Sequence, residues 1–193
     1  MRRCLLCLLL LSLVSVAAMA QLIANPPSVH LRGRSFSDLQ AGQRMLLSNY
    51  CRLDFEGARL HEDGWSRFKP YSTLRTNPEF ARIMVVTRFD IELPEQPSAI
   101  IGVHYQTVGS YDDTEGYTAH TEGSRVDFRI RELEGELMVT EIAPTTPHVS
   151  ARAAIAWMQK RLADPKTSEL EQAHLRDALA QLNRLAQPRP AAQ

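Results

Sequence analysis

Four stretches with an alternating pattern of apolar and polar residues follow one another in the middle of this chain. In Ile83–Glu92 and Ala99–Val108, β-branched and aromatic residues recur at every second position, which is the period of a half-buried β-strand. Val126–Arg131 and Leu137–Ile142 repeat the pattern on either side of Glu134-Gly135, and this arrangement predicts a hairpin. Because the strands are grouped and no helical pattern separates them, we expect an antiparallel sheet in an α+β fold.

Helical patterns precede the predicted strands. A first helix is expected over about residues 38–55, because Ser37 and Gln40 have the spacing of a capping box. A short helix or loop rich in aromatic residues is expected over about residues 65–80, and a long polar loop over 109–123. The apolar face of the first helix consists of Leu39, Leu46, Tyr50 and Leu53.

Two further helices are expected after the strands. Ser150 is placed to cap the first of them. Ser168 and Glu171 form a second capping box, and the helix that follows belongs to a C-terminal extension over residues 163–186. Residues 187–193 are rich in Pro and Ala and are expected to be a disordered tail. The apolar stripe of the extension consists of Leu175, Ala178, Leu179, Leu182 and Leu185.

Residues 1–20 have the layout of a secretory signal peptide. Arg2-Arg3 gives a positive start, an apolar run follows, and Ala18-Met19-Ala20 is a cleavage motif of small residues. An uncleaved membrane anchor is the alternative, but the apolar run is at the short limit for spanning a bilayer. We therefore expect cleavage after Ala20, an extended leader over residues 21–36, and a periplasmic or secreted protein without a membrane span.

The charge balance and the motif content argue against several classes of function. Lys plus Arg and Asp plus Glu both number 22, so the net charge is zero, whereas a nucleic-acid binder would normally carry a basic excess. The six His residues lack metal-ligand spacing, and no P-loop, GxGxxG or GxSxG motif occurs, so we expect no metal and no cofactor. Cys51 alone remains after signal cleavage, and it is expected to be a buried small hydrophobe.

Four short segments carry a resemblance to known proteins. They are Glu56–Leu60, Gly64–Phe68, Val85–Phe89 and Pro147–Ser150. Together they resemble uncharacterised exported bacterial proteins of the nuclear transport factor 2-like superfamily, which includes SnoaL-like and ketosteroid isomerase-like proteins and many non-catalytic modules. The resemblance covers residues 37–162. It implies a cystatin-like cone, in which a curved antiparallel sheet of about four to six strands wraps on the N-terminal helices, with the C-terminal helices as an addition.

Strand parity and helix periodicity select the residues that would face the hollow of such a cone. Tyr50 lies on the apolar face of the first helix, while Thr87, Tyr105 and Phe128 share strand faces with apolar residues. Trp65 lies in the aromatic-rich segment, and these five are the predicted ligand-binding residues. The alternative is that the tyrosines are core residues with hydrogen-bonded hydroxyls, and that Trp65 packs as part of a lid.

The resemblance to ketosteroid isomerase-like enzymes implies an acidic base with Tyr donors in a dry apolar pocket. The weak candidates for such a site are Tyr50, Tyr105 and Glu141, and no catalytic residue is assigned. Glu141 shares strand parity with Val139, but Ile142 is apolar on the other parity, so the direction of Glu141 stays open. Its alternative is a solvated or ion-paired carboxylate.

Three functions are compatible with these patterns. The leading hypothesis is an exported, non-catalytic binding module with a pocket for a small apolar ligand. The alternatives are a cofactor-free isomerase or lyase of the ketosteroid isomerase type, and a structural envelope interaction protein. A homodimer through the outer sheet face is also expected, unless the apolar stripe of the C-terminal helix covers that face within one chain. The apolar residues of outward parity are Met84, Val86, Ile100 and Val108.

Overall fold

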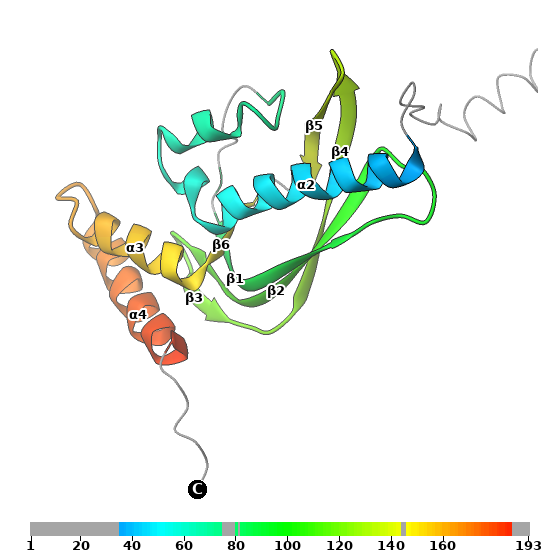
Figure 1. Cartoon of the computed structure of the whole chain (residues 1–193). Helices are drawn as coiled ribbons and strands as arrows, with labels where there is room; N and C mark the ends of the chain where they lie inside the picture. The colour runs from blue at the N-terminus through cyan, green and yellow to red at the C-terminus, as the bar shows by residue number, and fades with distance from the viewer. Residues whose placement is uncertain (1–34, 75–79, 81, 144–145, 187–193) are drawn as a thin grey trace, which may run out of the picture.

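One long helix lies in the hollow of a strongly curled sheet (Figure 1). The structure, a computed structural model, describes residues 35–74, 80, 82–143 and 146–186. The predicted signal peptide, nearly all of the predicted leader and the predicted tail lie outside the described residues. The long helix is α2 (Phe36–Phe55), and the strands are β1 (Arg82–Glu92), β2 (Ile100–Asp112), β3 (Gly116–Ala119), β4 (Gly123–Leu133), β5 (Glu136–Ala143) and β6 (His148–Ser150).

The sheet is mixed rather than purely antiparallel. Its order is β5-β4-β2-β1-β6, with β3 paired to β2, and all these pairs are antiparallel except β1 and β6. The parallel pair begins where Met84 N–H donates to the carbonyl of Pro147. β6 is too short to show a period in the sequence, and for this reason the expectation of an antiparallel sheet is wrong at this edge. The α+β class is confirmed.

α2 begins before the predicted residue 38. Its N-cap is Ser35, whose hydroxyl accepts a hydrogen bond from Asp38 N–H, while the Asp38 carboxylate accepts one from Ser35 N–H. This reciprocal pair is the capping box, and the predicted Ser37 lies inside the first turn instead. Asp38 also places a negative charge at the positive end of the helix dipole. The helix start is therefore set by Ser35 and Asp38.

The structure confirms the predicted hairpin but not the predicted long loop. The β4–β5 hairpin is confirmed, and Glu134 and Gly135 at its turn have left-handed φ angles of 52° and 87°. The long loop expected over residues 109–123 is wrong, because β2 continues to Asp112 and the chain returns at once as β3. Polar and small residues hide this strand pair from a reading based on apolar alternation.

Half-way along β1 and β2, the side chains of a given parity switch from one face of the sheet to the other. Their register shifts around Val86, and the ladder skips Thr87 of β1 and Val108 of β2. An extra residue in a strand moves the side chains that follow it to the opposite face. Val85 therefore belongs to the core on the far side of the sheet, although Phe89, with the same parity, packs under α2.

Two helices cover this far side. α3 (Ala151–Leu162) and α4 (Glu169–Ala186) lie side by side, at the end of the sheet away from the β4–β5 hairpin (Figure 1). They form a second core with one half of β1 and β2, so Leu175, Ala178 and Leu182 of the C-terminal stripe are buried within the chain, whereas Leu185 is exposed. The large buried members of this core are Ile83, Tyr111, Tyr117, Trp157, Met158, Leu175 and Leu182.

The apolar outer patch that motivated a homodimer is not formed by the residues expected to form it. Met84 and Val86 pack in the core under α2, and Val108 packs against the core of α3 and α4. Ile100 is exposed, at 44% of its surface. The homodimer therefore stays a prediction without structural support.

Candidate functional site

Four of the five predicted ligand-binding residues lie together in the core beneath α2. The rings of Tyr50 and Phe128 are 5.5 Å apart between centroids, and Trp65 belongs to the same buried cluster. The Tyr105 hydroxyl donates a hydrogen bond to Cys51 Sγ at 3.3 Å. The four aromatic side chains and Cys51 are all buried. These rings therefore pack against each other and fill the interior of the curled sheet.

Thr87, the remaining predicted residue, is exposed. Its hydroxyl donates a hydrogen bond to the Gln106 carbonyl at 3.3 Å. Because Thr87 is the residue that the β1–β2 ladder skips, it stands outside the alternation on which its assignment depended. Its predicted place in the interior is wrong for this reason.

Glu141 lies on the outer face of the sheet. Its side chain is 60% exposed and accepts a hydrogen bond from Arg129 Nε at 3.0 Å. Arg129 alternates along β4 with Phe128 and Ile130, both of which are buried under α2, so Arg129 and its partner point away from that core. The structure does not bring Glu141 to Tyr50 and Tyr105, and the three catalytic candidates do not form one site.

A buried ion pair joins the last turn of α2 to the segment that follows it. Arg59 donates from Nε to Asp54 Oδ1 at 2.7 Å and from Nη2 to Asp54 Oδ2 at 2.6 Å. The two side chains are at most 3% exposed. Asp54 Oδ2 also accepts the backbone N–H of His148 at 3.0 Å. The pair therefore connects α2 to the start of β6, and its hydrogen bonds offset the cost of burying two charges.

This ion pair is not apparent from the sequence. Asp54 lies inside the predicted first helix, and Arg59 is only one member of a segment that carries the family resemblance. The available signal is a pair of opposite charges on either side of Gly57. That glycine has a left-handed φ of 81° and turns the chain back at the helix end, which lets Arg59 reach Asp54.

Burial keeps the hydroxyls and the thiol near this pair protonated. It raises the pKa of Cys51 to about 12, and it is also the main cause of the raised pKa values of Tyr50 and Tyr105. Burial lowers the pKa of His148, whose Nδ1 donates to the Thr146 carbonyl at 2.9 Å. Neutral groups packed around a neutralised ion pair stabilise the fold, and a protonated thiol is a poor nucleophile.

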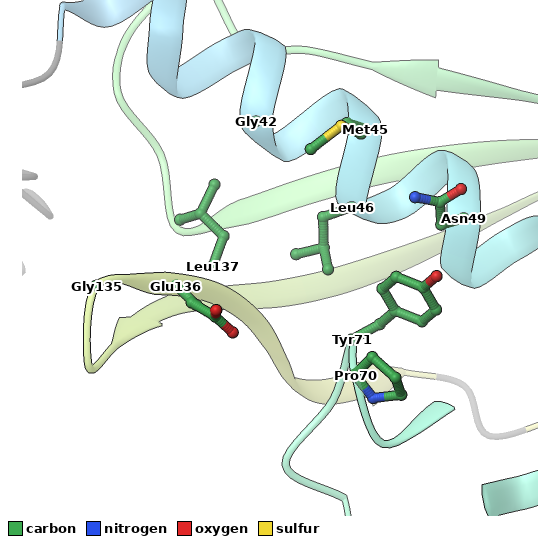
Figure 2. A pocket seen from close by; sticks show the side chains of 9 residues that line it. All are labelled: Gly42, Met45, Leu46, Asn49, Pro70, Tyr71, Gly135, Glu136 and Leu137. Atoms are coloured by element: carbon green, nitrogen blue, oxygen red, sulfur yellow. The ribbon is translucent and has the colours of Figure 1, made fainter. Parts of the chain in front are cut away.

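An open cavity lies outside this core, between α2 and the tip of the β4–β5 hairpin. Its volume is about 290 Å³. Figure 2 shows the side chains of Leu46 and Leu137 pointing into the same space, with Tyr71 at one end and Met45 on α2 above it. Met45 is 67% exposed, which leaves a large apolar side chain in contact with water. The other lining residues are Gly42, Asn49, Pro70, Gly135 and Glu136.

Two close approaches shape the walls of this cavity. A Cβ at Gly42 would lie 2.9 Å from Leu137 Cδ1, so the glycine allows α2 to approach the hairpin. On the opposite side, the segment Tyr71–Thr73 runs parallel to β5: Val139 N–H donates to the Tyr71 carbonyl at 2.8 Å, and Thr73 N–H donates to the Val139 carbonyl at 3.0 Å. The cavity is thus bounded by α2, β5 and this added segment.

A second hollow, of about 430 Å³, has different chemistry. It lies between the end of α3 and the turn that joins two short 3-10 helices, η1 (Ala58–Leu60) and η2 (Gly64–Phe68). Leu60 and Trp157 are its apolar members, whereas most of its wall is charged or polar. It is therefore less suited to an apolar ligand than the cavity beside β5. Its polar lining residues are His61, Glu62, Asp63, Lys160, Arg161 and Asp164.

Comparisons with protein-family models, with curated proteins and with solved structures found no match. The resemblance to nuclear transport factor 2-like proteins therefore stays a prediction. Among the residues that the structure describes, His, Cys, Asp and Glu side chains form no group suited to a metal ion. No helix in that part of the chain is both long and apolar enough to cross a bilayer. Function must therefore be argued from the site itself.

Proposed function

We propose that this protein is an exported, non-catalytic binding module that holds an apolar group in the cavity between α2 and the β4–β5 hairpin. The main support for this proposal is an exposed apolar surface at the cavity. Met45 is 67% exposed and lines the cavity together with Leu46, Leu137 and Tyr71. Covering apolar surface with a ligand is favourable by about 25 cal/mol per Å². Export is supported by the signal-peptide pattern of residues 1–20.

The core beneath α2 supports binding over isomerase or lyase chemistry. Tyr50 and Tyr105 are already packed against other side chains. Near them, both carboxylate oxygens of Asp54 are engaged by Arg59, and one also accepts the His148 N–H. A base that takes a proton from carbon must reach the substrate. A carboxylate fixed in a filled core does not meet that requirement, so the apolar cavity is the better candidate site.

Binding of the neutral apolar dye Nile red tests the proposal. Met45→Glu places a charge at the cavity and is expected to weaken dye binding by about tenfold or more, because the carboxylate would be desolvated by the dye. Leu170→Glu is the matched control, since Leu170 on α4 is also an exposed apolar residue, at 65%. It is expected to leave the affinity unchanged. Dye binding that is equal in the two variants would contradict the cavity as the binding site.

A further inference from the structure

The outer edge of β5 is paired at Val139. Both backbone groups of Val139 bond to the segment Tyr71–Thr73, so both point out of the sheet at this edge. No register shift separates Val139 from Leu137 in the β4–β5 ladder. Because backbone groups alternate in direction along a strand, the N–H and C=O of Leu137 point out of the same edge.

The covering segment turns away before it reaches Leu137. A parallel ladder continued by one step would bring Tyr71 N–H to the Leu137 carbonyl. Tyr71 N–H instead donates to the Phe68 carbonyl at 2.8 Å, and Pro70 before it has no N–H. Within the described part of the chain, the added ladder therefore ends at Val139. Leu137 keeps one backbone donor and one acceptor directed outward.

This open position on the edge lies directly beside the cavity. The side chain of Leu137 lines the cavity together with Leu46 and Met45 (Figure 2). A residue of an added strand that pairs with Leu137 would point its side chain to the same face, and so into the cavity. Main-chain hydrogen bonds combined with a side-chain pocket are how sheet edges bind extended peptides. A small apolar molecule would leave both backbone groups of Leu137 unused.

The hairpin tip adds a charge preference. Glu132, Glu134 and Glu136 lie on both sides of the hairpin turn, and Glu136 lines the cavity. In the β4–β5 register Glu132 shares a face with Leu137, whereas Glu136 lies on the other face with Leu133 and Arg131. No Lys or Arg among the described residues forms an ion pair with these three carboxylates, whereas Glu141 on the same hairpin pairs with Arg129. Acidic side chains without an ion pair around the end of a groove attract a basic partner and disfavour an acidic one.

We infer that the site binds an extended polypeptide segment in which one large apolar side chain is flanked by Lys or Arg. The segment adds to β5 at Leu137 and places its apolar side chain in the cavity beside Leu46. Its basic side chains lie near Glu134 and Glu136. This inference rests on the proposed function and names the class of ligand for the same cavity.

Fluorescence anisotropy with the full chain and a labelled synthetic peptide tests the charge preference. The peptide carries one Phe between Lys residues in an otherwise Thr-rich, extended sequence. We expect saturable binding that weakens by about tenfold or more when the Lys residues are replaced by Glu, or when the protein carries Glu136→Lys. Glu122→Lys is the matched control, because Glu122 is an exposed carboxylate on the β3–β4 connection. The Glu122→Lys protein is expected to bind the Lys peptide with the same affinity as the unmodified protein.

Backbone N-methylation of the peptide tests strand addition separately from charge. Each singly methylated peptide keeps its side chains and loses one N–H donor. We expect one position next to the Phe at which methylation weakens binding by about tenfold, because that N–H donates to the Leu137 carbonyl. Methylation at the adjoining positions is expected to have little effect. Equal weakening at every position, or at none, would overturn strand addition at Leu137.

The dye and the peptide together separate this inference from the proposed function. If Nile red binds in a Met45-dependent way and the peptide does not bind, the cavity remains a binding site and the inference is overturned. If neither binds, both fail. If light scattering shows a dimer that Met45→Glu dissociates, a second copy of the chain occupies the groove, and the inference is again overturned.

Discussion

Two charged residues are stable in the core of this protein because they neutralise each other. Arg59 occupies both oxygens of Asp54, and the His148 N–H adds a third hydrogen bond. Burial alone would lower the pKa of Arg59, but the adjacent carboxylate outweighs it and the pKa is raised. The guanidinium therefore stays charged. Since Asp54 and His148 are far apart in the chain, the pair fixes the end of α2 against β6.

Removing one partner of this pair is expected to be strongly destabilising. Arg59→Met leaves the Asp54 carboxylate buried and unpaired, and should lower the free energy of unfolding by roughly 3–5 kcal/mol. Arg52→Met is the control, because Arg52 forms an exposed ion pair with Glu56, and should cost less than about 1 kcal/mol. Urea unfolding followed by circular dichroism measures both. Similar losses in the two variants would show that burial of the Asp54–Arg59 pair does not matter.

Residues on the apolar face of a helix are the ones whose burial can be predicted from sequence. Tyr50 was expected to point inward because it shares a face with Leu46 and Leu53, and it is buried. Asp54 is buried as well, but its burial could not be predicted from the residue type, since carboxylates are mostly exposed. Its burial depends on Arg59, and only the turn at Gly57 brings that partner near.

At the level of single elements, periodicity predicted the strands better than the directions of their side chains. The four strands expected from alternation are all present, although β2 extends several residues into the predicted loop and β4 begins at the end of that loop. The skipped residues Thr87 and Val108 are ordinary strand-forming types, so nothing in their identity marks a bulge. At these two residues the side chains that follow move to the opposite face of the sheet. A parity count carried across them therefore placed Thr87 and Val86 on the wrong sides.

The β4–β5 turn makes a prediction at this scale. Gly135 has a φ of 87°, and a Cβ added there would meet no atom within 4 Å, so Gly135→Ala tests backbone strain alone. We expect a loss of about 1–2 kcal/mol in the free energy of unfolding. Gly123→Ala is the control, because its nearest neighbour would be 3.8 Å away and its φ is not left-handed. It should change stability by less than about 0.5 kcal/mol. An equal effect at both sites would argue against the left-handed turn.

The whole molecule has two apolar cores on opposite sides of one sheet. The first lies under α2, and the second lies between the sheet and the α3–α4 pair. One half of β1 contributes to both cores, which explains the unbroken apolar run Ile83–Val86. α4 is therefore an integral part of the fold rather than an appended segment.

Paired substitutions in α4 test this integration. Leu182 is fully buried and Leu185, one turn further on, is 56% exposed. Leu182→Ala should lower the free energy of unfolding by about 2–5 kcal/mol, whereas Leu185→Ala should change it by less than about 0.5 kcal/mol. The expected loss should appear in one cooperative transition, seen alike by circular dichroism and by Trp fluorescence. A separate transition for α4, with the rest of the protein unaffected, would contradict a shared core.

The sequence by itself determined the α+β class, the order of the main helices and strands, and the turn at Glu134-Gly135. These features follow from local periods and turn preferences, which neighbouring residues express. Only the tertiary structure decided the parallel strand β6, the inner and outer faces of β1, the Asp54–Arg59 pair and the open edge at Leu137. Each of these depends on which distant segment lies alongside, and no local pattern along the chain records that choice.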